Sequence, residues 1–221
     1  MKSAHGFGFE ARDRSYNLIA LLRRISLMST SLKVVAIIMF AAFAGACATR
    51  PPIPAEAADA AFLAERDLAG ASVARGEFRT ITGVRRGFTA HLDGSWDGTT
   101  LTLIEDFEFD DGERDRKTWR LARIAPGRYL GTREDVVGEA VGYQDGRAFR
   151  LEYSIVLPSE NGRGRQVRFR DVMVLDSRGD VLNEATVGWF GVRVGSVSLR
   201  ISPTDNLPAA MTEGAESAAT P

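Results

Sequence analysis

The sequence predicts an all-β protein, an antiparallel up-and-down barrel of about ten strands with one short helix near its N-terminus. Apolar residues alternate with polar ones over many short stretches, which is the period of a strand with one buried face. Turn sequences rich in Gly, Asp and Pro separate these stretches at short intervals. Ten strands in one open sheet would leave two unpaired edges, and closure into a barrel removes both. An open β-sandwich is the alternative architecture.

The stretch Asp93–Trp119 shows this pattern most clearly. Four apolar residues of its first strand share one face: Leu101, Leu103, Phe107 and Phe109. The turn Asp110-Asp111-Gly112 then reverses the chain, and the alternation resumes on the returning strand. Glu105 falls in the same register as the four apolar residues, so a carboxylate is expected on the face that points inward.

The other strands follow at regular spacing. The ten predicted strands are residues 73–81, 84–92, 99–109, 114–124, 128–133, 136–143, 147–157, 165–175, 181–187 and 190–201. The apolar register of the last one shifts across Gly195-Ser196, which predicts a β-bulge. Residues 57–68 are rich in Ala and end before Gly70, so they predict one short helix packed at an end of the barrel. An extension of the preceding linker is the alternative.

The N-terminal region carries the features of an export signal. Val34–Ala44 is an apolar run that follows Lys33, too short to span a bilayer comfortably but typical of a signal sequence. Small residues lead from it directly into Cys47, the single cysteine. This junction resembles the lipobox of bacterial lipoproteins, although its position −3 is Ala44 and not Leu. The resemblance implies that Cys47 is lipidated. An ordinary secretory signal and an uncleaved membrane anchor are the alternatives.

These features divide the chain into five segments. Residues 1–27 lengthen the signal beyond its usual size, so translation is expected to start at Met28, with the signal peptide at 28–46. Residues 47–57 form the lipidated cysteine and a Pro-rich tether that is not expected to fold. The barrel domain is predicted at 58–202 and a disordered tail at 203–221. Because Ala48 follows the cysteine where Asp would retain a lipoprotein at the inner membrane, the resemblance implies the outer membrane, facing the periplasm.

Composition argues against several classes of function. The chain has 28 Lys and Arg against 29 Asp and Glu, a formal net charge of −1, which does not suit a nucleic-acid binder. One cysteine allows no internal disulfide, and His91 is the only histidine after the signal, so no metal site is expected. No cofactor-binding or nucleophile motif is present, so no cofactor is predicted and an enzyme is not the favoured hypothesis.

Polar residues on otherwise apolar strand faces are the candidates for a ligand site. The polar candidates are Glu105, Asp171, Asn183, Arg86 and Arg133, and the aromatic candidates for its walls are Trp96, Trp119, Tyr129, Phe149 and Tyr153. Burial of an unpaired carboxylate costs several kcal/mol, so Glu105 and Asp171 are expected to be paired or protonated.

Three interpretations of this polar set remain open. It forms internal salt bridges, in which case amide replacements of Glu105 and Asp171 should lower stability. Alternatively, it binds the polar head of an apolar ligand. In the third interpretation, Glu105 and Asp171 act as a general acid and base in an isomerase or hydrolase.

Three stretches resemble, in the same order, a family of bacterial lipoproteins of unknown function, DUF3833. They are GSWDGTTLTLIEDFEFDDGERDRKTWRL, YLGTREDVVGEAVG and VRFRDVMVLDSRGDVLNEATVGWFGVRVGSVSL. The first stretch opens with Gly94-Ser95-Trp96, similar to the Gly-x-Trp tripeptide of lipocalins, although there it belongs to the first strand. The resemblance implies a single exported domain and no known catalytic residues.

The leading functional hypothesis is therefore an envelope lipoprotein that binds or carries a small hydrophobic or amphipathic ligand. A structural or interaction protein with a filled barrel is the main alternative. The membrane, through the lipid anchor, is the expected partner, and the sequence leaves the oligomeric state open.

Overall fold

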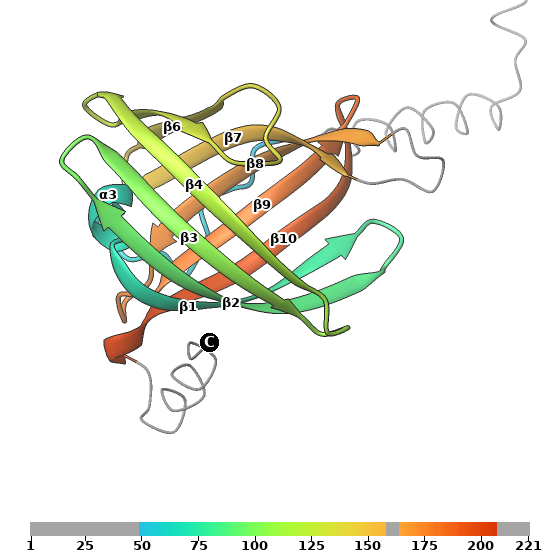
Figure 1. Cartoon of the computed structure of the whole chain (residues 1–221), viewed down its shortest axis with the longest axis horizontal. Coiled ribbons are helices and arrows are strands. Elements are labelled where there is room, and N and C mark those ends of the chain that lie inside the picture. Colours follow the sequence, from blue (N-terminus) through green and yellow to red (C-terminus); the bar gives the residue numbers. More distant parts are fainter. Residues whose placement is uncertain (1–48, 158–163, 207–221) are drawn as a thin grey trace, which may run out of the picture. The chain divides into compact units, whose positions relative to one another are not determined.

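Ten antiparallel strands form a closed barrel in the computed structural model, which describes residues 49–157 and 164–206 (Figure 1). Each strand pairs with the next along the chain, and the first strand pairs with the last. The predicted barrel is thus confirmed, and the closing pair of strands excludes the open sandwich. The proposed signal, Cys47 and most of the C-terminal tail lie outside the described residues.

The strand bounds agree closely with the alternation in the sequence. The strands are β1 Gly70–Thr80, β2 Arg85–Trp96, β3 Thr100–Phe109, β4 Arg114–Ala125, β5 Arg128–Thr132, β6 Ala140–Asp145, β7 Ala148–Leu157, β8 Arg165–Leu175, β9 Val181–Trp189 and β10 Val192–Pro203. A short 3₁₀ helix, η1 Thr204–Asn206, follows. The strand predicted from Val136 starts only at Ala140. Residues 133–139 form a loop, in which Val136 makes an isolated bridge to Ile155.

The predicted β-bulge is present in β10. Its register against β9 shifts between Arg193 and Gly195. A Cβ atom at Gly195 would lie 2.9 Å from the backbone oxygen of Arg79 and 3.1 Å from the ring of Phe78. The glycine therefore lets β10 bend closely against β1 as the barrel closes.

One end of the barrel is sealed by the segment before β1. The helix predicted at 57–68 is reduced to the single turn α3 Ala64–Asp67, in which the Asp67 carboxylate accepts a 2.7 Å hydrogen bond from the backbone N–H of Leu63. Phe62 is fully buried beside Phe149, with ring centroids 6.0 Å apart, and Leu68 is also buried. Burial of these apolar side chains, more than helix propensity, holds the segment. Within residues 49–157 and 164–206, no helix is both long and apolar enough to cross a bilayer.

Residues 49–57 lie along the outside of the barrel, in contrast to the unfolded tether that their Pro content predicts. Ile53 and Ala57 pack on an outward-facing apolar cluster formed by Ala148, Val172 and Val174. Polar contacts extend this docking: Arg50 binds Glu152 at 2.7 Å, and Arg150 donates to the backbone oxygen of Pro51 at 2.7 Å. The exposed apolar face of β8 needs a cover, and this segment supplies it.

Gly94 of the Gly-x-Trp tripeptide allows α3 to approach β2. A Cβ atom at this position would lie 1.7 Å from the backbone oxygen of Leu68. The Gly94→Ala variant should therefore lose about 2 kcal/mol of stability in chemical denaturation, the range found for overpacking. Ser95→Ala, at the exposed neighbouring position, is the matched control and should change little. Equal stability of the two variants would contradict this account.

Candidate functional site

Four of the predicted polar residues meet inside the barrel, and together they are called the interior polar cluster. It consists of Glu105 on β3, Asp171 on β8, Asn183 on β9 and Arg133, which directly follows β5. Each lies in the inward register of its strand or continues it, as the alternation predicted for Glu105, Asp171 and Asn183. The sequence left the register of the strand before Arg133 ambiguous. Asn183 Nδ2 lies 3.4 Å from Asp171 Oδ2, and an Arg133 Nη1 atom lies 3.7 Å from Glu105 Oε2.

Arg133 is the cation of the cluster, with only 11% of its side chain exposed. Its Nε donates to Asp135 Oδ1 at 2.7 Å, and its guanidinium carbon lies 4.7 Å from the ring centroid of Trp119 and 5.4 Å from that of Tyr153. Burial alone would lower the pKa of Arg133, but Tyr153, Glu105 and Asp135 outweigh it and raise the pKa above its ordinary value. The guanidinium therefore stays charged. Aromatic contacts of this kind stabilise a partly desolvated cation.

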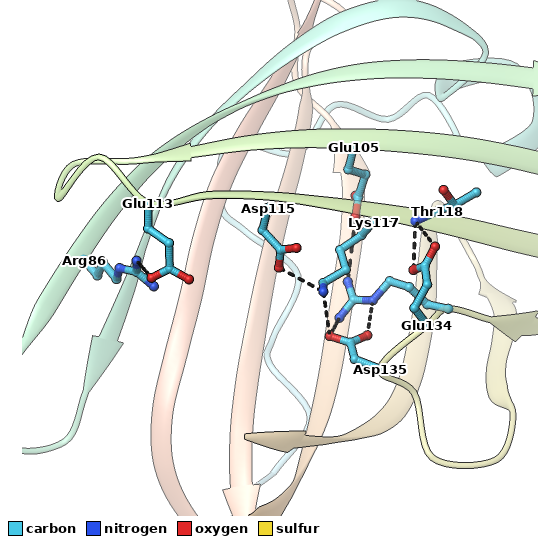
Figure 2. Close-up of polar contacts among 9 residues, drawn as sticks. Arg86, Glu105, Glu113, Asp115, Lys117, Thr118, Glu134 and Asp135 are labelled. Carbon is cyan, nitrogen blue, oxygen red and sulfur yellow. Dashed lines mark hydrogen bonds and ion pairs between the residues drawn. The ribbon is translucent and has the colours of Figure 1, made fainter. Parts of the chain in front are cut away.

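Further charged residues connect Arg133 to the rim of the barrel (Figure 2). Lys117 on β4 contacts Asp115 at 2.9 Å and Asp135 at 4.0 Å. Sequence reasoning did not single out these three residues. The inward register of Lys117, two positions before Trp119, was an available signal for it. No periodic signal existed for Asp135, because it lies in the loop between β5 and β6.

Three buried oxygen atoms of the cluster have no hydrogen-bond partner. They are Glu105 Oε2, Asp171 Oδ1 and Asn183 Oδ1. The 3.7 Å contact between Glu105 and Arg133 allows electrostatic attraction but is too long for a hydrogen bond. Buried polar atoms in folded proteins are almost always paired, so three such oxygens around one interior indicate a place where a donor group would be stabilised.

Burial dominates the ionisation of both carboxyl groups. It raises the pKa of Glu105 to about 7 and that of Asp171 to about 7, against the smaller opposing effects of Arg133 on both and of the Asn183 hydrogen bond on Asp171. Near neutral pH each group is therefore balanced between its acidic and ionised forms. The cluster can then donate or accept a hydrogen bond, depending on what lies next to it.

A cavity of about 60 Å³ lies beside the cluster. Glu105 and Asn183 are the polar residues of its wall, and the rest of the lining is apolar, including Ala90, Trp119 and Met173. It is much smaller than the roughly 300–1,000 Å³ of pockets that hold drug-sized ligands. In this structure the barrel is thus nearly filled, with room for a few water molecules or a very small organic group.

The two ends of the barrel are closed differently. The α3 end is sealed by buried side chains such as Phe62 and Leu68. At the other end Phe88, Phe107 and Phe109 pack against one another with ring centroids 5.6–6.0 Å apart, and Phe107 and Phe109 are only partly buried. Phe88 and Phe107 also line the cavity, so this end separates it from solvent by side chains that are in part exposed.

Three predicted site residues lie elsewhere. Arg86 sits at the rim, where it binds Asp111 and Glu113 and covers the ring of Phe109. Trp96, at the last position of β2, is covered by Arg123. Tyr129 donates to Glu65 near α3. Strand alternation places all three side chains inward, but it does not report how far along the barrel axis each one lies.

Metal chemistry finds no support in the described residues. No group of three or more His, Cys, Asp or Glu side chains among them is arranged to hold a metal ion.

Comparison with known proteins places the chain in one uncharacterised group. Residues 41–202 match the family model described as "Protein of unknown function (DUF3833)". No curated protein matches the chain. Solved structures that match include EF1p2_mFAP2b bound to DFHBI, 12% identical with a TM-score of 0.34, covering 63% of this chain and 96% of that one. The redesigned β-barrel mFAP1 bound to DFHBI is 12% identical with a TM-score of 0.31, covering 61% and 96%. At this level of similarity neither structure bears on what this chain binds.

Proposed function

This chain belongs to the DUF3833 family, and we propose that it is an envelope lipoprotein whose barrel binds a small amphipathic molecule. The polar end of that molecule lies at the interior polar cluster, and its apolar part lies in the cavity beside it. Lipidated Cys47 holds the barrel at the outer membrane, on its periplasmic side.

The unpaired buried oxygens are the observation that supports ligand binding. Glu105 Oε2 and Asn183 Oδ1 belong to residues of the cavity wall, and Asp171 lies behind Asn183. A ligand with a hydroxyl or ammonium group would supply the missing donors, and an ammonium group would also favour the ionised carboxyl groups. Because the rest of the wall is apolar, a short hydrocarbon body suits it better than a sugar or a nucleotide.

The size of the cavity limits this proposal. About 60 Å³ accommodates only a few non-hydrogen atoms, so a larger ligand has to displace side chains. Met173 lines the cavity and Phe107 is only partly buried, and both side chains change rotamer more readily than a packed β-branched residue. Binding of a longer molecule is therefore coupled to opening of the phenylalanine end.

The membrane attachment is supported by the N-terminal sequence. The apolar run Val34–Ala44 and the single cysteine have the order of a lipoprotein signal, and the family match extends across Cys47. For a lipid anchor, the wild-type protein should be found in the membrane fraction, with an acyl mass on its N-terminal peptide. The Cys47→Ser variant should leave the membrane fraction and lack that acyl mass.

The nearly filled interior supports the second candidate function. In that case the barrel is a rigid scaffold that works through its outer surface, and water occupies the cavity and pairs with the three oxygens. Occupancy of the cavity distinguishes the two functions directly.

Native mass spectrometry tests the proposal. The full chain is purified from a bacterial host in detergent, and the detergent is removed in the gas phase. The expected result is a defined extra mass that is lost on denaturation. The Ala90→Leu variant fills the cavity from a fully buried position of its wall, so it should fold without the extra mass.

Val141→Leu, at an exposed position of β6, is the matched control and should retain the extra mass. An extra mass that persists in Ala90→Leu would place the ligand outside the barrel. A wild-type protein that never carries one would favour the scaffold.

A further inference from the structure

Two neighbouring hairpins, β1–β2 and β9–β10, lie at the end of the barrel opposite α3 (Figure 1). Both expose large apolar side chains. We call this surface the apolar rim. Its members are Ile81 and Val84 in the β1–β2 hairpin and Trp189, Phe190 and Val192 in the β9–β10 hairpin. The hairpins adjoin because β1 pairs with β10, and the backbone N–H of Ile81 donates to the backbone oxygen of Val194 at 3.1 Å. Exposed apolar patches of this kind mark surfaces that contact a partner.

The tip of the β9–β10 hairpin carries an aromatic residue at a position that disfavours it. Phe190 has a φ of 47° and is 88% exposed. With Gly191 it forms a two-residue turn in which both residues have positive φ, a geometry that usually selects Asn or Asp followed by Gly. Folding alone would therefore favour a small polar residue here. Its exposed ring meets the ring of Trp189 edge-on, with centroids 5.1 Å apart. This exposed aromatic pair indicates a contact outside the barrel.

Arginines accompany the apolar side chains on these two hairpins and at the start of β8. The guanidinium carbon of Arg165 lies 4.6 Å from the ring centroid of Trp189, and Arg79, Arg85 and Arg193 are exposed on the two hairpins. Glu77 is the acid that contacts Arg79 and Arg85. Trp and Arg side chains around exposed aliphatic residues are the composition that favours the interface of an anionic bilayer.

The first residues that the structure describes contact the outer wall of the barrel next to the strands that carry the apolar rim. Arg50 binds Glu152, which also binds Arg168 at 2.8 Å. Arg168 in turn lines a surface groove together with Trp189 and Phe190. Cys47 is three residues before Arg50, a distance of at most about 11 Å along an extended chain. A lipid on Cys47 would thus enter the bilayer within reach of the strands that carry the rim.

We propose that the apolar rim lies against the phospholipid surface that holds the protein, with Trp189 and Phe190 in the headgroup region and the arginines on anionic lipid phosphates. The inference rests on the proposed membrane attachment. It orients the barrel so that its phenylalanine-closed end faces the lipid.

Tryptophan quenching by brominated lipids tests this orientation. The full chain, isolated from bacterial envelopes, is placed on vesicles of phosphatidylethanolamine and phosphatidylglycerol with brominated acyl chains. The quenched signal that disappears in Trp189→Phe belongs to Trp189. Asparagine suits the positive φ, so Phe190→Asn should fold normally, yet it should lose most of this quenching. The wild-type chain should also lose most of it on vesicles in which phosphatidylcholine replaces phosphatidylglycerol.

Ile124→Asn, at an exposed apolar position near the α3 end, is the matched control and should leave the quenching unchanged. A chain that floats with the vesicles while its Trp189 signal is unquenched overturns the rim contact and leaves the anchor intact. Quenched Trp189 in a chain whose N-terminal peptide lacks acyl mass supports the rim and overturns the lipid anchor. A chain that does not float, or a dimer that protects Trp189, overturns the rim contact.

Discussion

The Asp171→Asn variant should be more stable than the wild-type barrel at pH 8 and no more stable at pH 4. Burial raises the pKa of Asp171 in the folded state to about 7, well above its value in an unfolded chain. Between these values the folded state binds more protons than the unfolded state, so the free energy of unfolding falls as the pH rises. Glu105 behaves in the same way, with a folded pKa of about 7.

The expected difference at pH 8 is about 4 kcal/mol for Asp171→Asn and about 3 kcal/mol for Glu105→Gln, from about 1.4 kcal/mol per unit of pKa shift. That corresponds to a rise in melting temperature of about 5–10 °C. Because Glu105 and Asp171 influence each other, the double variant should gain less than the sum. Other carboxyl groups with lowered pKa values, such as Glu152 and Asp176, destabilise the wild type in acid, so the comparison between variant and wild type carries the result.

Asp106→Asn is the matched control, since Asp106 is a half-exposed partner of Arg116 on the outer surface. It should change stability by less than about 1 kcal/mol at either pH. A stability loss at pH 8 in both interior variants would mean that the acids act as structural salt bridges, as one interpretation of the sequence held. The geometry favours the opposite sign because, in the described part of the chain, Asp171 makes no ion pair and Glu105 makes only a long one.

The Arg133→Met variant should lose about 3–5 kcal/mol of stability at pH 8, the cost of leaving a buried charge without its partner. Arg133 is the cation that contacts both Glu105 and Asp135, and methionine replaces it beside Trp119 with an unbranched side chain that carries no charge. At pH 5 the loss should be smaller, because Glu105 is then protonated and no longer needs the cation. Chemical denaturation at the two pH values measures both quantities.

Glu105→Gln should rescue part of the Arg133→Met loss, since it removes one of the two acids that Arg133 contacts. Arg114→Met, on an exposed pair with Glu108, is the matched control and should change stability by less than about 1 kcal/mol. A loss in Arg133→Met that is equal at both pH values and indifferent to Glu105→Gln would assign the effect to packing alone.

Local periodicity explains which parts of the structure could be predicted. The side chains of a strand alternate with period two, so Glu105, Asp171 and Asn183 could be assigned to the inner face from their neighbours alone. The bulge at Gly195 left the same local signature, because one extra residue reverses the alternation. The loop that carries Asp135 has no such period, and its role was therefore missed.

The height of a residue along the barrel axis could not be predicted. Strands in a closed barrel are tilted and staggered, so residues of equal register on neighbouring strands lie at different heights. This stagger separates Arg86 and Trp96 from the acids and brings Arg133 to them, although all three were candidates for the same interior site. It also placed Lys117 beside Asp135, a pair that no spacing in the sequence relates.

The sequence by itself determined the class of fold, the number of strands, the bulge and the inward direction of the interior acids, because each follows from contacts between residues close in the chain. Only the tertiary structure decided that the barrel is nearly filled, that three oxygens within it are unpaired, and that residues 49–57 pack on its outer wall. Those properties depend on side-chain volumes and distances across the closed barrel, which sum over many strands and leave no trace in the spacing of any one of them.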